Sequence, residues 1–126
     1  MTHILIVDDS PKDANEVKDI LEKEGYQTSA ASSGEEGIQK AIDIKPDIVL
    51  MDVVMPGLNG FQATRKITKN PATISVKVII VSSKNMDSDI AWAKMQGASD
   101  FLVKPVSSEN LLSSIKNVLS SIKNVL

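Results

Sequence analysis

The chain contains no cysteine, which excludes a disulfide framework, thiolate catalysis and a cysteine-ligated zinc site. It also lacks an excess of charge of either sign, because 14 Lys and Arg residues face 16 Asp and Glu residues. The formal net charge of -2 gives no electrostatic support for binding nucleic acid or another polyanion. We therefore expect no nucleic-acid partner.

Long hydrophobic runs are also missing, and none reaches the length of a membrane span. The N-terminus enters a strand pattern at once, without the basic region and apolar core of a secretion signal. We expect a soluble, cytoplasmic protein that does not bind membranes. A chain of 126 residues predicts one domain over positions 1–126, with no room for a DNA-binding output domain.

What the chain does have is five short apolar runs that alternate with helical patterns. This alternation is typical of repeated βαβ units and predicts an α/β fold with a parallel sheet. The predicted strands are 3–7, 26–31, 47–52, 76–82 and 100–103. The predicted helices begin at Ser10-Pro11 and end at Gly25, begin at Ser33 and end before Pro46, and then cover 61–69, 88–96 and the region from about Ser107 onward.

Residues used in phosphoryl chemistry close four of these runs. Asp8-Asp9 follow the first, Asp52 the third, Ser82 the fourth and Lys104 the fifth. Parallel strands bring their carboxyl ends to one edge of a sheet, so we expect these groups to converge. Singly, each is more often a turn acid, a bonded hydroxyl or a surface lysine. Their joint occurrence in this order favours a shared site.

Three crowded carboxylates repel one another unless a cation lies among them. Mg²⁺ suits such a place because it prefers oxygen ligands and retains water for an incoming phosphate. The Lys104 ammonium on the other side would stabilise the charge that a transferred phosphoryl group spreads over its oxygens. Asp52 stands alone at its strand end, and we predict that it accepts the phosphoryl group as an acyl phosphate.

The ordered motifs DD, MDVVMPGLNG, VIIVSSK and GASDFLVKP resemble the receiver domain of bacterial two-component response regulators. The resemblance runs from about His3 to Leu119. The amino acids within these motifs are similar to those of the single-domain chemotaxis and twitching-motility receivers. It implies a flavodoxin-like (βα)5 fold, with a five-stranded parallel sheet in the order 2-1-3-4-5 and helices on both faces.

The resemblance also implies roles for single residues. Asp52 corresponds to the phosphoacceptor, and Mg²⁺ would be bound by Asp9, by Asp52, by Asp8 mainly through water, and by the backbone carbonyl of Val54. Ser82 corresponds to the hydroxyl that bonds a phosphoryl oxygen.

Lys104 matches the lysine that pairs with the acceptor. The Lys104–Pro105 peptide bond is expected to be cis. Phe101 occupies the position of a switch aromatic. Trp92, on the fourth predicted helix, is either a packing residue or an exposed anchor for a partner.

By the same resemblance, the chain is a stand-alone response regulator that catalyses only its own phosphorylation and dephosphorylation. Its donor would be a phosphohistidine on a sensor histidine kinase or a phosphotransfer protein. Its output would be a target protein bound through the fourth helix, fifth strand and fifth helix. The alternative within this class is a phosphate sink or shuttle in a longer relay. His3, the single histidine, is interpreted as a structural residue.

Two other classes use similar folds. A phosphatase of the haloacid dehalogenase type requires a second Asp two residues beyond its nucleophile, where this chain has Val54. A flavin or nucleotide carrier requires a phosphate-cradling glycine loop after the first strand. This chain reads DDSPKD at that place, so the glycine loop is absent.

The segment SSIKNVL occurs at 113–119 and again, unchanged, at 120–126. The copy keeps Ile122, Val125 and Leu126 in line with the apolar stripe of the last helix and would lengthen that helix by about 10 Å. Two interpretations remain open. The extension is a harmless tail, or it promotes a weak homodimer through the last helix.

Overall fold

The structure is a computed structural model that describes residues 1–84 and 86–123, and it contains five strands and five α-helices in regular alternation. The strands are β1 (His3–Val7), β2 (Gln27–Ala31), β3 (Ile48–Met51), β4 (Lys77–Ser82) and β5 (Asp100–Val103). The helices are α1 (Pro11–Lys23), α2 (Gly34–Ile44), α3 (Gly60–Thr68), α4 (Asp87–Met95) and α5 (Ser108–Lys123), and a 3-10 turn, η1 (Pro71–Thr73), precedes β4.

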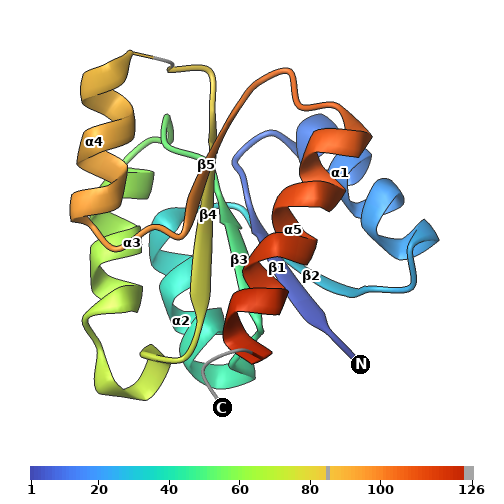
Figure 1. The fold of residues 1–126 in the computed structure, drawn as a ribbon. Helices are drawn as coiled ribbons and strands as arrows, with labels where there is room; N and C mark the ends of the chain where they lie inside the picture. The colour runs from blue at the N-terminus through green and yellow to red at the C-terminus, as the bar shows by residue number, and fades with distance from the viewer. Residues whose placement is uncertain (85, 124–126) are drawn as a thin grey trace.

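The five strands form one parallel sheet in the order β2-β1-β3-β4-β5 (Figure 1). The register places Val7 beside Met51, and Met51 beside Ile80, so the three central strands end at nearly the same level. Both the parallel sheet predicted from the alternation and the strand order implied by the resemblance are confirmed. The central strands are buried on both faces, which is why they read as continuous apolar runs.

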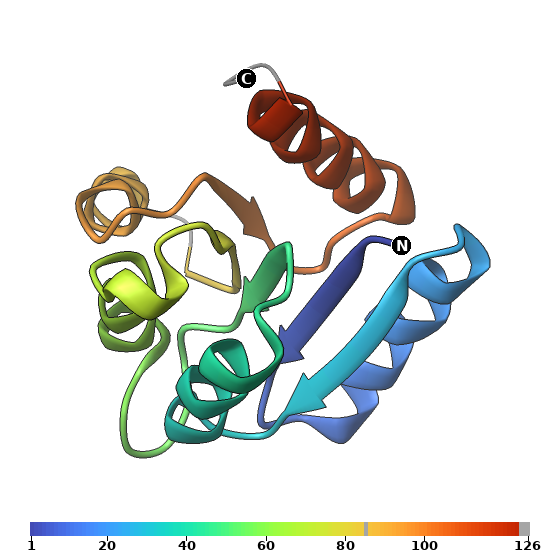
Figure 2. The ribbon, with the colours of Figure 1, turned by 90° about the horizontal axis from the view of Figure 1, so that it is seen from below.

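Helices cover both faces of the sheet, with α1 and α5 on one side and α2, α3 and α4 on the other (Figure 2). Alternate residues of the strands point to opposite faces, so the sheet separates two apolar clusters. On the α1 and α5 side, Ile6 and Leu50 pack with Leu111 and Ile115 of α5. These clusters fix the positions from which the strand ends project.

The helix boundaries follow the sequence signals. The Ser10 hydroxyl accepts the backbone N–H of Asp13, which is the expected N-cap of α1, and Ser33 accepts the N–H of Glu36 in the same way in α2. After α1 the chain reverses at Gly25, whose φ of 89° is a left-handed conformation that costs glycine little. The predicted start and stop of α1 are thus confirmed.

Small differences separate prediction and structure. The predicted strand and helix ends move by one or two residues, and the 3-10 turn η1 was not predicted. His3 has a structural contact, since its Nε2 lies 2.7 Å from the Ser29 hydroxyl on β2. The described part of α5 ends at Lys123, so the last three residues of the repeated heptad lie outside the described residues. No described helix combines the length and apolarity that crossing a bilayer requires.

Candidate metal and phosphoryl site at the carboxyl edge of the sheet

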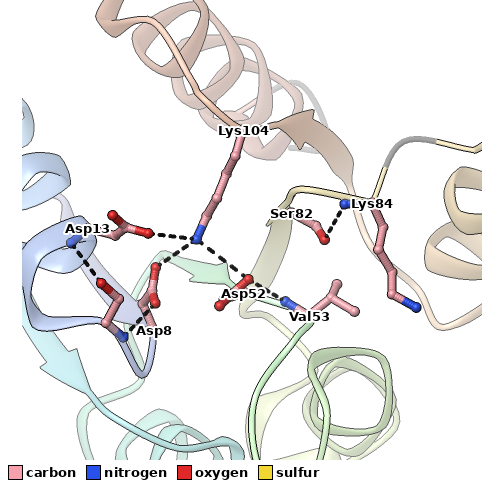
Figure 3. Close-up of polar contacts among 8 residues, drawn as sticks. Asp8, Asp13, Asp52, Val53, Ser82, Lys84 and Lys104 are labelled. Carbon is pink, nitrogen blue, oxygen red and sulfur yellow. Dashed lines mark hydrogen bonds and ion pairs between the residues drawn. The ribbon is translucent and has the colours of Figure 1, made fainter.

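The residues predicted to form a site converge at one edge of the sheet. Asp8 follows β1, Asp52 follows β3, Ser82 ends β4 and Lys104 follows β5. Figure 3 shows the Lys104 side chain reaching between Asp8 and Asp52, with Ser82 on the β4 side of Asp52. The convergence inferred from parallel strand ends therefore describes the arrangement found.

Three carboxylates form a compact cluster. Asp8, Asp9 and Asp52 each offer an oxygen, and these oxygens lie within 4.8 Å of one another. Asp8 and Asp52 are buried, whereas Asp9 is exposed. Hard oxygen donors with one open side are what Mg²⁺ requires, because this ion keeps part of its water shell. The residues present therefore fit a divalent ion of this kind.

Lys104 is the cation that faces this cluster. Its Nζ lies 3.1 Å from Asp8 Oδ2 and 3.6 Å from Asp52 Oδ1. It also lies 3.3 Å from Asp13 Oδ2, a contact that the sequence reasoning did not predict. The Lys104–Pro105 peptide bond is cis, as expected. The ammonium thus balances part of the negative charge at the buried end of the site.

The electrostatics favour a basic, nucleophilic Asp52. Burial raises the pKa of Asp52, the Lys104 charge lowers it, and the Asp8 charge raises it again, with a net upward shift. Burial also acts to lower the pKa of Lys104, but the Asp8 hydrogen bond and the Asp52 charge outweigh this and raise that pKa. A carboxylate that is destabilised by burial is more reactive toward an electrophile than an exposed one.

The loop after β3 holds Asp52 in place. Asp52 Oδ1 accepts the backbone N–H of Val53 at 2.9 Å, and the Gly60 N–H donates to the Val53 carbonyl at 3.1 Å. A Cβ on Gly60 would lie 2.0 Å from the Asp52 carbonyl oxygen, so only glycine allows this approach. The Val54 side chain is exposed beside the site.

The residues predicted to sense a phosphoryl group come from β4 and β5. Ser82 is fully buried, and its hydroxyl accepts the backbone N–H of Lys84 at 3.1 Å (Figure 3). Phe101 lies on β5 opposite Ile80 and packs, partly buried, against the apolar cluster on the α2, α3 and α4 side. The two side chains therefore belong to neighbouring strands.

A cavity of about 390 Å³ lies on the α1 and α5 side of the sheet, next to the acid cluster, and residues of α1, including Glu16 and Val17, line it together with the strand ends. Its polar wall includes Asp8, Asp52 and Lys104, and its apolar wall includes Ile6 and Leu50. The cavity gives the Lys104 side chain space to change its position.

Asp13 is the residue of this site that sequence reasoning missed. Asp13 lies in the first turn of α1, where an acid is favourable to the helix dipole, so its sequence position has a purely structural explanation. One available signal was its place: α1 starts directly beyond the strand end that carries Asp8, so its first turn borders the same edge.

Comparison with known proteins gives one consistent family. The response regulator receiver domain matches residues 4–116. Protein PilH of Pseudomonas aeruginosa is 52% identical over 115 residues, which cover 91% of this chain and 95% of PilH. The chemotaxis protein CheY of Thermotoga maritima is 35% identical over 113 residues, 89% of this chain and 92% of that protein. A CheY-like receiver domain from Methanospirillum hungatei has a TM-score of 0.93 at 28% identity, covering 100% of this chain and 99% of that one.

These relatives confirm the resemblance read from the motifs, including its flavodoxin-like fold. Receiver domains bind Mg²⁺ at an acidic pocket, interact with histidine kinases or phosphotransfer proteins, and are signalling proteins, not conventional enzymes. The matched region carries every residue of the converging site described above. The chain therefore belongs to the response regulator receiver domain family and is CheY-like.

Proposed function

We propose that this chain is a stand-alone response regulator that accepts a phosphoryl group on Asp52 from a phosphohistidine. The observation that carries the proposal is the setting of Asp52. Its side chain is only 9% exposed, lies 3.6 Å from the Lys104 ammonium, and shares a cluster with Asp8 and Asp9. This combination of a buried carboxylate, an adjacent ammonium and a place for a metal ion is suited to phosphoryl transfer.

Asp9 and Asp52 would bind Mg²⁺ directly, Asp8 mainly through water, and Val54 through its backbone carbonyl. The ion, when bound, would neutralise charge on the phosphoryl oxygens. The buried acids Asp8 and Asp52 support this role because their charges are poorly solvated without a cation.

In the proposed reaction an Asp52 carboxylate oxygen attacks phosphorus, and an O–P bond forms while the N–P bond of the donor breaks. The leaving imidazole retains the electron pair and takes a proton. Lys104 pairs with the phosphoryl oxygens, and the Ser82 hydroxyl hydrogen-bonds one of them. Each residue acts from a strand end, so the sheet brings their backbone positions together before the donor arrives.

The signal would pass from Ser82 to Phe101. Movement of the Ser82 hydroxyl toward the phosphate vacates space beside β5, and Phe101 turns inward to fill it. The surface made by α4, β5 and α5 would then favour a target protein. Trp92 on α4 and Val103 on β5 are 49% and 41% exposed, so this surface offers apolar side chains to a partner.

The biological process is proposed to be motility or chemotaxis signalling. The support is the 52% identity to PilH together with the similarity to CheY, a chemotaxis protein by name. The match covers 95% and 92% of these two relatives, so the similarity extends over nearly their whole length.

Phosphoramidate, a small donor with an N–P bond, tests the function when it is added with Mg²⁺ and the intact mass is measured. We expect the mass of one phosphoryl group to be added to the wild type, and none to Asp52→Asn or to a sample with a chelator. An adduct of equal yield in Asp52→Asn would overturn the proposal.

A further inference from the structure

Lys104 is held on the α1 side of the site by Asp13, which lies outside the acid cluster. Its Nζ donates hydrogen bonds to Asp8 Oδ2 at 3.1 Å and to Asp13 Oδ2 at 3.3 Å, whereas Asp52 Oδ1 is 3.6 Å away and forms an ion pair only (Figure 3). The ammonium therefore points mainly toward β1 and α1, and the acceptor is its most distant partner.

Charge, not packing, sets this position of Lys104. Its side chain is 24% exposed and borders the cavity of about 390 Å³, so other rotamers have space. The backbone of Asp13 is held in place, because its N–H donates a hydrogen bond to the Ser10 hydroxyl that caps α1. The Asp13 side chain is 44% exposed, so solvent screening keeps its electrostatic attraction for Lys104 modest.

A phosphoryl group on Asp52 would compete with Asp13 for the same ammonium. Before phosphorylation, Asp13 draws the Lys104 charge toward α1 and so away from Asp52, while the hydrogen bond from Lys104 to Asp8 is kept. After phosphorylation, Lys104 must exchange Asp13 for the phosphoryl oxygens, and this exchange weakens the phosphorylated state.

We propose that Asp13 is a positioning residue that retains Lys104 until a phosphoryl group arrives, and that it acts on metal affinity and phosphoryl affinity in opposite directions. The inference rests on the proposed function, because it requires Lys104 to pair with a phosphoryl group on Asp52. Asp13, a residue of α1, would then control how readily Lys104 leaves its hydrogen bond with Asp13 for the phosphoryl group.

Calorimetric titration of Asp13→Asn tests the idea with two probes. The first is Mg²⁺ alone, and the second is beryllium trifluoride, a phosphoryl mimic, at saturating Mg²⁺. We expect Mg²⁺ affinity to fall and beryllium trifluoride affinity to rise, each by about two- to fivefold, the range of a partly exposed ion pair. A variant that merely disturbed the fold would lose affinity for both probes.

Removal of a negative charge alone shifts both affinities in these directions, so a charge-matched control is needed. Glu16→Gln serves, because Glu16 is an exposed acid of α1 that borders the same cavity, and the described contacts of Lys104 do not include it. We expect its effects to be clearly smaller than those of Asp13→Asn.

A Lys104→Met background isolates the path through the lysine. In this background, Asp13→Asn should change Mg²⁺ affinity no more than Glu16→Gln does. An equally large effect with and without Lys104 would overturn the inference, because Asp13 would then act through space alone. If the wild type bound no beryllium trifluoride with Mg²⁺, the proposed function itself would fail. If it bound the mimic and Asp13→Asn matched Glu16→Gln, only the inference would fail.

Discussion

At the residue scale, burial of Asp52 is the property on which the chemistry depends. The protein places the buried carboxylate of Asp52 beside a second buried acid, Asp8, and offsets only part of the charge with Lys104. The raised pKa of Asp52 records this cost. A reactive group that destabilises the fold in its charged form is common at functional sites.

The pH dependence of stability follows from this shift. The pKa of Asp52 is higher in the folded state than in the unfolded state, so protonation of Asp52 adds to the free energy of unfolding. This stabilisation is fully present below the ordinary aspartate pKa and is lost as the pH rises through the raised pKa. Without metal, Asp52→Asn should therefore raise the melting temperature at neutral pH, and the gain should disappear at acid pH.

Melting curves of the wild type and of Asp52→Asn, recorded in a chelator from acid to neutral pH, check this expectation. Asp19→Asn, on the exposed side of α1, is the control for loss of a surface charge. A lower melting temperature for Asp52→Asn at neutral pH would show that Lys104 outweighs burial.

A second residue-scale prediction concerns the lifetime of the acyl phosphate. The Val54 side chain, 55% exposed beside the site, cannot hydrogen-bond a water that attacks phosphorus. Val54→Asn should speed hydrolysis by about two- to tenfold, the worth of one hydrogen bond.

The rate of phosphate loss after removal of the donor, followed by intact mass, gives the measurement. Val54→Ala is the matched control, because it shortens the side chain without adding a polar group. Loss from Val54→Asn at or below the rate of Val54→Ala would contradict the predicted role of the side chain.

Residues at strand ends could be predicted from the sequence, while contacts across the site could not. Asp52, Ser82 and Lys104 each terminate an apolar run, so topology alone brings them together. Asp13 reaches Lys104 because of where the first turn of α1 lies over the sheet edge, and that depends on helix packing. Hydrophobic periodicity carries no information on such a placement.

At the element scale, the loop between β3 and α3 determines the position of the phosphoacceptor Asp52. Gly60 starts α3 and lies directly against the backbone of Asp52. Gly60→Ala forces the loop to shift, and overpacking of this kind costs about 1–3 kcal/mol of stability. We also expect phosphorylation of Asp52 to slow, because the loop orients its carboxylate.

Urea denaturation and the rate of adduct formation with a small phosphoryl donor measure the two effects. Lys66→Ala, at an exposed position of the same helix, should leave both unchanged within a few tenths of a kcal/mol. If Gly60→Ala behaved like Lys66→Ala, the close approach would have no role.

Elements with strong caps or long apolar runs were predictable, and weakly marked ones were less so. The edge strand β2 reads QTSAA, which has little apolar character, and its start was predicted one residue early. The turn η1 was not predicted although Asn70 caps it, because a three-residue turn has no periodicity to detect. The strand order came from family resemblance, since alternation of strands and helices fits several orders.

At the scale of the whole molecule, the repeated heptad bears on self-association. The first copy supplies Ile115 and Val118 to the core, and the second copy repeats the same residue types at 120–126. Under the self-association hypothesis, the full chain should sediment at high concentration with a larger average mass than a chain that ends at Leu119. Monomeric behaviour of both chains, with and without phosphorylation, would leave the repeat without an associative role.

The function proposed for the whole molecule depends on Asp52 as the residue that carries the phosphoryl group. The most direct measurement is to phosphorylate the wild type with acetyl phosphate and Mg²⁺, reduce the acyl phosphate with borohydride, and map the peptides by mass spectrometry. We expect homoserine at position 52 and unmodified aspartate at positions 8, 9 and 13. Homoserine at one of those three positions with Asp52 intact would contradict this expectation.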